Sequence, residues 1–217
     1  MNVYKGITYI LFFLLIDFVN VEYIVGQETD MRFVIGAQAE WKRMDIGLYN
    51  MNFFTVDGIW FQNNTRFAVD FKSNNNFRFG TGYQYEYKEL GEKIQRENRV
   101  MLFLHYLKKW NNWELKDLST MEFRFINGAL YNRYRNQLGL YYTHWHIAHP
   151  FILTEAFINV DRMQYIRQRT TIGARLPVDN LTFTLFGFHE TTRILEQKWV
   201  NHFSFGIVGV YKFNEKL

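Results

Sequence analysis

The chain has 217 residues, no cysteine and a formal net charge of +4. This length suits one ordinary domain or one medium-sized barrel. The absence of cysteine excludes a disulfide framework, a thiol nucleophile and a cysteine-based metal site. The charges are scattered, with no basic run of the kind that marks a nucleic-acid patch, so nucleic acid is not expected as a partner.

The aromatic content is high for a chain of this polarity. Aromatic residues make up 19% of the sequence, yet the mean hydropathy is negative. A soluble domain with so many rings would normally have a large aliphatic core as well. Here the rings accompany many Asn, Arg, Gln and Thr residues, a combination typical of a wall with one apolar and one polar face.

The first 26 residues have the layout of a secretory signal peptide. A lysine-bearing start is followed by the apolar run ITYILFFLLI and by a small residue before a polar end. Hydrophobic regions of signal peptides run to about 7–15 residues. Cleavage is predicted after Gly26, which leaves residues 27–217 as a single domain. The alternative is a membrane anchor, but an anchor needs about 20 apolar residues, and Asp17 and Glu22 interrupt such a span.

From residue 32 onward the dominant period is two, which favours strands over helices. In NHFSFGIVGVYKF, for example, Phe203, Phe205 and Ile207 fall on one face, and His202 and Ser204 fall on the other. Candidate strands cover residues 32–42, 46–55, 64–72, 77–88, 98–109, 114–126, 132–146, 150–160, 163–176, 180–192 and 200–213. Segments of about ten residues are long enough for a tilted strand to cross a bilayer.

The connections alternate in length. Short clusters such as KRMD, KSNNN and PVDN alternate with longer, more charged segments such as TVDGIWFQNN, KELGEKIQREN and ETTRILEQK. This alternation is the pattern of outer-membrane barrels. The expected fold is therefore all-β, a transmembrane up-and-down antiparallel β-barrel. Bacterial single-chain barrels have an even number of strands, so we expect ten to twelve, with twelve favoured.

Aromatic residues near the short turns predict a membrane-interface girdle. Its candidate members are Trp41, Trp110, Trp113, Trp145, Tyr211 and Phe213. The alternative is that the tryptophans pack the core of a sandwich.

Five segments resemble a known family in their order and spacing: FRFGTGYQYEY, LYNRYRNQLGLYY, HPFILTEAFINV, YIRQRTTIGARL and FSFGIVGVYKF. Together they resemble the domain of unknown function 2490 family of bacterial outer-membrane proteins. The resemblance covers most of residues 32–213. It implies an outer-membrane barrel, and it brings no reaction, substrate or catalytic residue.

If the apolar faces meet lipid, the charged faces line the lumen. Charges facing lipid at mid-depth would cost about 2–4 kcal/mol for Arg or Lys, which favours inward placement. The candidate lumen network comprises Arg66, Asp70, Glu86, Glu122, Arg124, Arg133, Arg135, Glu155, Arg167, Arg169 and Arg175. Two interpretations are open: the network fills and rigidifies a closed barrel, or it forms an arginine-biased constriction that favours anionic solutes.

Catalytic and metal sites are not expected. His144, His146 and His149 form a cluster without a nearby acidic partner, and a metal site needs three or four convergent ligands. The sequence contains three serines, and neither Ser73 nor Ser204 has a nucleophile setting. No cofactor, metal or enzymatic activity is therefore predicted.

Together these features predict a porin-like bacterial outer-membrane barrel. Its role would be structural, or that of a narrow pore for small solutes with a charged lumen. A lipid-acting enzyme, a lipid- or ligand-binding barrel and a soluble secreted barrel with inward rings are the alternatives. The expected partners are outer-membrane lipids, the barrel assembly machinery and a small anionic solute. The sequence leaves the oligomeric state open.

Overall fold

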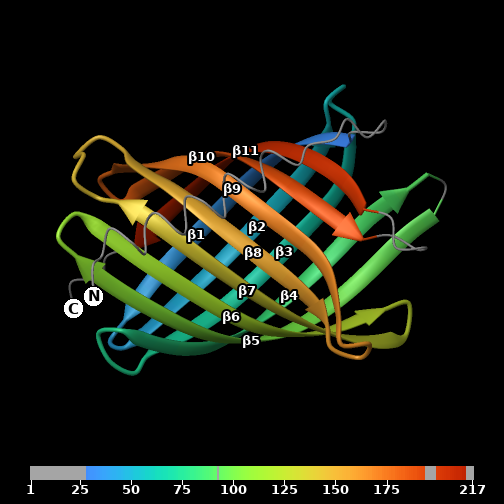
Figure 1. Cartoon of the computed structure of the whole chain (residues 1–217), viewed down its shortest axis with the longest axis horizontal. Helices are drawn as coiled ribbons and strands as arrows, with labels where there is room; N and C mark the ends of the chain where they lie inside the picture. The colour runs from blue at the N-terminus through green and yellow to red at the C-terminus, as the bar shows by residue number, and fades with distance from the viewer. Residues whose placement is uncertain (1–27, 92, 194–198, 214–217) are drawn as a thin grey trace.

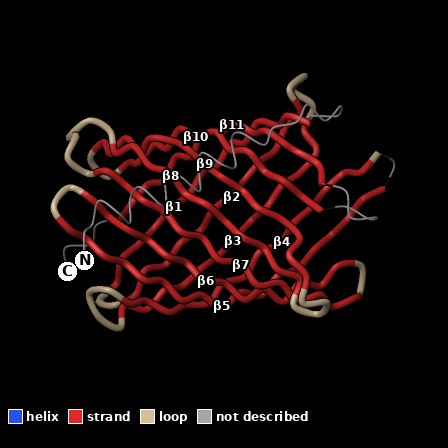
Figure 2. Tube along the Cα trace, viewed as in Figure 1, coloured by secondary structure: helices blue, strands red, loops and turns tan. Residues whose placement is uncertain are grey.

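The computed structural model describes residues 28–91, 93–193 and 199–213, which form a closed β-barrel (Figure 1). The predicted signal peptide, residues 1–26, lies outside the described residues. Strands make up nearly all of the described chain, and loops are confined to the two ends of the barrel (Figure 2). The part of the chain that is described contains no helix of the length and apolar character needed to cross a membrane.

The described residues contain eleven strands, one for each candidate segment of the sequence. They are β1 (Glu28–Trp41), β2 (Met44–Thr55), β3 (Trp60–Lys72), β4 (Phe77–Leu90), β5 (Lys93–Trp110), β6 (Trp113–Ile126), β7 (Ala129–Tyr142), β8 (His149–Asn159), β9 (Gln164–Val178), β10 (Leu181–Arg193) and β11 (Trp199–Phe213). Eleven lies within the predicted range, one below the favoured number of twelve.

The barrel closes through one parallel pair. Each strand pairs antiparallel with the next along the chain, and β1 pairs in parallel with β11. Because consecutive strands alternate in direction, an odd number makes the first and the last strand run the same way. The start of β1 and the end of β11 therefore lie at opposite ends of the barrel.

The described connections are short at both ends of the barrel, so the predicted alternation in length does not occur among them. The end called the short-turn end holds the connections β1–β2, β3–β4, β5–β6, β7–β8 and β9–β10, and the end called the loop end, from which the β4–β5 hairpin projects, holds those between β2–β3, β4–β5, β6–β7 and β8–β9. Asn111 and Asp179 have φ angles of 47° and 50° in two-residue turns at the short-turn end. Tight hairpins require such positive φ values, which Asn and Asp tolerate.

The connections predicted as long loops at the loop end are partly strand. β4 continues to Leu90 and β5 begins at Lys93, and these two residues pair with each other. β3 likewise begins at Trp60 rather than at residue 64. The polar composition of these segments suggested loops, but the antiparallel ladder continues through them (Figure 1). The β7–β8 connection is longer than predicted, because β7 ends at Tyr142 rather than at residue 146.

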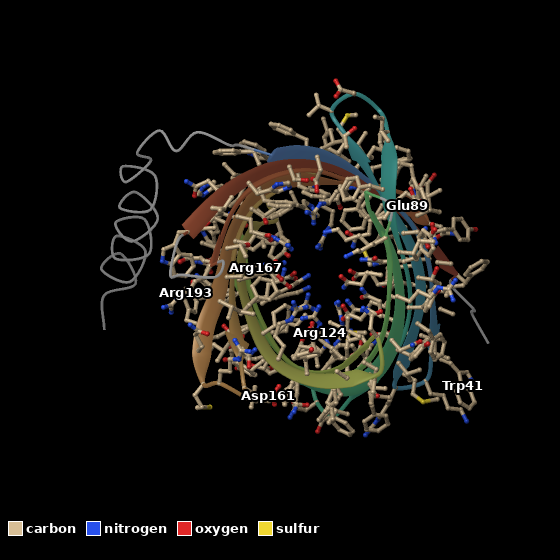
Figure 3. The ribbon with its side chains drawn as sticks, turned by 90° about the vertical axis from the view of Figure 1, so that its right-hand side faces the viewer. Trp41, Glu89, Arg124, Asp161, Arg167 and Arg193 are labelled. Atoms are coloured by element: carbon tan, nitrogen blue, oxygen red, sulfur yellow. The ribbon has the colours of Figure 1, made fainter. Side chains whose placement is uncertain are left out.

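The wall has an apolar outer face and a polar inner face. Phe205 and Ile35 on the outer face are 60% and 74% exposed, whereas Ser204, the neighbour of Phe205, is fully buried on the inner face. These are the faces that the alternation in the sequence predicts. Viewed from the loop end, Trp41 lies outside the wall, while Arg124 and Arg167 lie on its inner side (Figure 3).

A small apolar cluster occupies part of the interior. Met101 and Phe103 on β5 are almost fully buried, and they pack with Ala68 on β3, two strands away, and with Leu118 on the neighbouring β6. Along the inner face of β5, two charged side chains are thus followed by two apolar ones, because Glu97 and Arg99 precede Met101 and Phe103 on that face. The interior is consequently polar at the loop end and partly apolar in its middle.

Candidate functional site

All eleven residues of the candidate lumen network lie on strands and on their inner faces. They are Arg66, Asp70, Glu86, Glu122, Arg124, Arg133, Arg135, Glu155, Arg167, Arg169 and Arg175. The strands that carry them, from β3 to β9, therefore bring together charges that are up to about 110 positions apart in the sequence. Most of these charges gather in the loop-end half of the lumen, whereas Asp70 and Arg175 lie toward the short-turn end.

Glu122 on β6 is the centre of one ion-pair cluster. Its side chain is fully buried, and Arg133 Nε on β7 donates a hydrogen bond of 2.7 Å to Glu122 Oε2. Arg135 and Arg99 lie 3.7 and 3.8 Å from the same carboxylate. Three guanidinium groups therefore surround one carboxylate that has no contact with solvent.

Arg169 on β9 links its own strand to β8 and β10 on either side. Its guanidinium donates to Glu155 on β8 at 3.0 Å and to Glu190 on β10 at 2.5 Å. Arg167, two residues before it on β9, lies 3.4 Å from Glu190. The sequence suggests that Glu190 is a solvated loop charge. The structure corrects this, because β10 extends to Arg193 and turns Glu190 into the lumen, where it is buried.

The fully buried Glu97 completes the network on β5. Arg124 donates to it through two hydrogen bonds of 2.7 Å, and Arg99 donates a third of 2.8 Å. Arg99 also lies 3.2 Å from Glu86 on β4. Sequence reasoning missed Glu97 and Arg99, because Glu97 falls in a charged segment read as a loop. Continuing the period of two backwards from Met101 would have identified both.

Two lumen arginines have no ion-pair partner among the described residues. Arg66 lies 4.9 Å from the centre of the Phe103 ring, and its Nε atom is buried without a hydrogen-bond acceptor. Arg175 lies 4.8 Å from the centre of the Tyr141 ring. No carboxylate of the described chain lies within 4 Å of either guanidinium.

Three adjoining cavities occupy the interior. The loop-end chamber has a volume of about 680 Å³, the middle one about 500 Å³ and the one at the short-turn end about 650 Å³. Arg66 and Met51 line both the loop-end and the middle cavity. Asp70, His105 and Lys116 line both the middle and the short-turn cavity. The shared walls place the cavities in one row along the barrel.

The loop-end chamber is lined mainly by cations. Lys88 and eight arginines face three carboxylates, Asp30, Glu86 and Glu190. The arginines are Arg32, Arg66, Arg99, Arg124, Arg133, Arg135, Arg167 and Arg169. The carboxylates of Glu97 and Glu122 are fully buried behind them. The surface that a solute would meet is therefore positive, although most of the arginines are paired.

The cavity at the short-turn end is also rich in cations. Lys116 forms an ion pair of 2.6 Å with Glu114 and lies 4.7 Å from the centre of the Tyr141 ring, which Arg175 also contacts. His105 Nε2 lies 3.1 Å from Asp70 Oδ1. Two cations, Lys116 and Arg175, therefore contact the Tyr141 ring at the end of the lumen opposite the arginine chamber.

A separate polar cluster holds the parallel seam between β1 and β11. The buried carboxylate of Asp30 accepts hydrogen bonds from Arg32 and from the Ser204 hydroxyl, and it lies 3.2 Å from His202 Nε2. The carboxylate lies between the hydroxyl and the imidazole, so the imidazole is not placed to take a proton from Ser204. His105 and Ser119 lie on opposite faces of the wall.

The histidine cluster of the sequence lies at the short-turn end. His144 and His146 belong to the β7–β8 connection, and His149 begins β8. Within the described ranges, no three histidine, aspartate or glutamate side chains converge in a way that could hold a metal ion.

The six aromatic residues predicted as a girdle lie at the short-turn end. Trp41, Trp110, Trp113 and Phe213 begin or end a strand there, Tyr211 lies two residues from the end of β11, and Trp145 lies in the β7–β8 connection. Trp41, Trp145, Tyr211 and Phe213 expose between 42% and 58% of their surface. These rings form one rim of the outer wall.

No curated protein matches the chain by sequence. Among solved structures, the barrel resembles LpxR from Salmonella typhimurium with a TM-score of 0.50 and 10% identity, over 80% of this chain and 85% of that one. An anion-selective porin from Comamonas acidovorans matches with a TM-score of 0.41 and 9% identity, over 77% of this chain and 52% of that one. At 10% identity, the match to LpxR shows a likeness of fold alone. The family model described as "Protein of unknown function (DUF2490)" matches residues 22–200, so the chain belongs to the DUF2490 family.

Proposed function

We propose that this protein is an exported outer-membrane β-barrel whose lumen forms a narrow passage favouring small anions. The observation that carries the proposal is the arginine-lined chamber at the loop end, in which guanidinium groups lie in front of the buried carboxylates of Glu97 and Glu122. Fixed positive charge in a narrow lumen attracts anions and repels cations.

The outer wall supports a location in the membrane. Large apolar side chains such as Leu102, Leu104 and Phe205 are more than half exposed on the outer face. A soluble protein seldom exposes so continuous an apolar surface. In outer-membrane barrels aromatic girdles lie at the membrane interfaces, so the aromatic rim would lie at one of them. Outer-membrane lipids and the barrel assembly machinery are the partners that this location implies.

Two residues give the passage its preference for anions. Arg66 lies where the loop-end and middle cavities adjoin, and Arg175 lines the cavity at the short-turn end. Because neither is paired with a carboxylate in the described chain, an anion can approach each guanidinium without displacing a carboxylate from it. Charge-assisted hydrogen bonds to such groups are stronger than those between neutral groups.

The alternatives fit the geometry less well. A barrel that carries an apolar ligand needs an apolar interior, whereas the three interior cavities are lined largely by charged and polar side chains. A closed, purely structural barrel is compatible with the ion pairs. It leaves the guanidiniums of Arg66 and Arg175 without a carboxylate partner in the described chain, a costly arrangement for a lumen that admits no solute.

The test is planar-bilayer conductance of the refolded protein without its first 26 residues. Reversal potentials in a gradient of potassium chloride report the ratio of anion to cation permeability. We expect steady channels that favour chloride, and we expect Arg66→Gln and Arg175→Gln each to lower that ratio by at least about twofold. Arg96→Gln is the matched control, because Arg96 is exposed on the outer face of β5 and its loss removes the same charge.

Three results would overturn the proposal. A folded barrel that passes no current would favour the closed structural role. Channels that prefer cations would show that the lumen arginines do not determine the ion selectivity. An equal effect of Arg96→Gln and Arg66→Gln would show that the total charge of the protein, rather than the lining of the passage, sets the preference.

A further inference from the structure

Four polar side chains form a connected cluster on the outer face of β6 and β7. Asn136 Nδ2 donates to Asp117 Oδ1 at 2.7 Å and to Ser119 Oγ at 3.2 Å. The hydroxyls of Ser119 and Tyr134 lie 3.0 Å apart. These four residues alternate along their strands with inward residues such as Glu122 and Arg135, so they face away from the lumen.

The cluster lies within an apolar part of the wall. Ser119 is the seventh of the fourteen residues of β6. Its cross-strand neighbour on β5 is Leu104, and the neighbour of Asp117 on β7 is Leu138. If the barrel spans the membrane as proposed above, Asp117 faces the hydrocarbon region rather than the lipid headgroups. An ionisable residue at that depth is costly, and where one occurs it usually contacts a polar partner.

The hydrogen bonds within the cluster leave both donors and acceptors available. The two amide protons of Asn136 are taken by Asp117 and Ser119. The two hydroxyl protons of Ser119 and Tyr134 supply one bond between them, which leaves one free proton. Among the described residues, no side chain donates to Asp117 Oδ2. The cluster therefore presents a free hydroxyl donor beside a free carboxylate acceptor.

A second copy of the same surface complements this arrangement. In a two-fold interface, if residue i of one copy contacts residue j of the other, then residue j of the first copy also contacts residue i of the second. A donor and an acceptor on the same surface can therefore form two equivalent hydrogen bonds across the axis. Tyr134 of one barrel can then donate to Asp117 of the other, and Leu104 and Leu138 of both copies can pack around the pair. Hydrogen bonds of this kind hold membrane proteins together where no hydrophobic driving force acts.

We propose that the protein self-associates in the membrane through the outer faces of β6 and β7, with Asp117, Ser119, Tyr134 and Asn136 at the centre of the interface. The proposal rests on the membrane location inferred above. It is independent of whether the lumen conducts.

The absence of native cysteine allows a direct test. A single thiol is introduced by Leu138→Cys beside the cluster, or by Leu185→Cys on β10, where the native leucine also lies on the outer face. The full chain without residues 1–26 is refolded into phosphatidylcholine vesicles at a high ratio of lipid to protein and treated with a short bis-maleimide. We expect covalent dimers from Leu138→Cys, and monomers from the Leu185→Cys control.

A second substitution tests the cluster itself. Asp117→Leu removes the carboxylate and makes the wall more apolar, so it should preserve insertion while lowering the dimer yield of Leu138→Cys about tenfold. Heat-modifiable migration on gels and protease resistance report insertion separately from association. Inserted barrels that remain monomeric, or that crosslink equally through both thiols, would overturn the proposed interface. Failure of every variant to insert would instead overturn the membrane location.

Discussion

Arg124 on β6 donates two parallel hydrogen bonds, both 2.7 Å long, to the carboxylate of Glu97 on β5. Glu97 is fully buried, and Arg99 contacts it as well. A bidentate pair of this kind is among the strongest that side chains form. It fixes two strands to each other on the inner side of the wall, where no water replaces a lost partner easily.

Glu97→Gln should therefore destabilise the barrel strongly. The change leaves two guanidiniums near a neutral amide, and breaking a buried ion pair in this way typically costs about 3–5 kcal/mol. Urea unfolding of the refolded protein, followed by tryptophan fluorescence, measures the effect. Glu89→Gln in the exposed β4–β5 hairpin is the control, with an expected change within about 0.5 kcal/mol. Equal unfolding midpoints for the two variants would contradict the structural role of Glu97.

A matched pair of substitutions on β5 tests membrane insertion. Leu102 and Ile94 lie on the outer face of this strand, and each is 51% exposed. Leu102 belongs to the middle of the strand, and Ile94 to the hairpin at the loop end. Leu102→Arg should cost about 2–4 kcal/mol and block insertion into vesicles, whereas Ile94→Arg should insert almost normally. A soluble barrel would tolerate both changes alike.

The seam between β1 and β11 should be sensitive to its hydroxyl. Ser204 donates to the buried carboxylate of Asp30, so Ser204→Ala removes one donor from a group that has little access to water. The expected loss of stability is about 1–3 kcal/mol. It is measured as a lower temperature of conversion from the folded to the unfolded band on gels. Ser73→Ala, in the exposed β3–β4 turn, should leave that temperature unchanged.

The β8–β9 turn should respond to acid. Asp161 accepts hydrogen bonds from the backbone and side-chain nitrogens of Asn132, and these bonds lower the pKa of its carboxyl group. Because the pKa is lowered in the folded state, ionised Asp161 stabilises the fold fully above the ordinary aspartate pKa of about 4. This stabilisation is lost as the pH falls through the lowered pKa. NMR titration of the Asn132 amide should follow this loss, and Asp161→Asn should abolish it. An Asn132 amide shift that titrates equally in the variant would contradict the assignment.

The period-two alternation was enough to predict the strands and their faces. Phe205 and Ser204 differ by one position, and the pleat alone sends one outward and the other inward. All eleven candidate strands occur, since each has a clear alternation over most of its length. Their ends were less predictable. Polar residues around Leu90 and Lys93 are equally suited to a loop and to a strand that projects beyond the apolar band.

The contacts within the lumen could not be predicted from one strand at a time. The pairing of Arg124 with Glu97 depends on the register between β5 and β6, which the turn at Asn111 sets. The polar cluster on the outer face of β6 and β7 could not be predicted from the sequence for a related reason. Along β6, Lys116 and Asp117 are adjacent charges on opposite faces, so the pattern of that strand alone does not separate lumen from wall. Only the position of Asn136 on β7 shows which polar residues belong together.

The parallel seam also has a consequence for the order of events during assembly. Asp30 and its partner Ser204 are 174 positions apart in the sequence. One edge of β1 therefore stays unpaired until the last strand of the chain has folded. An open strand edge is a template for aggregation, and pairing across such a separation is slow. The nascent barrel must have that edge shielded until its last strand arrives, so the time spent waiting for β11, rather than the formation of any hairpin, should limit the yield of folded protein.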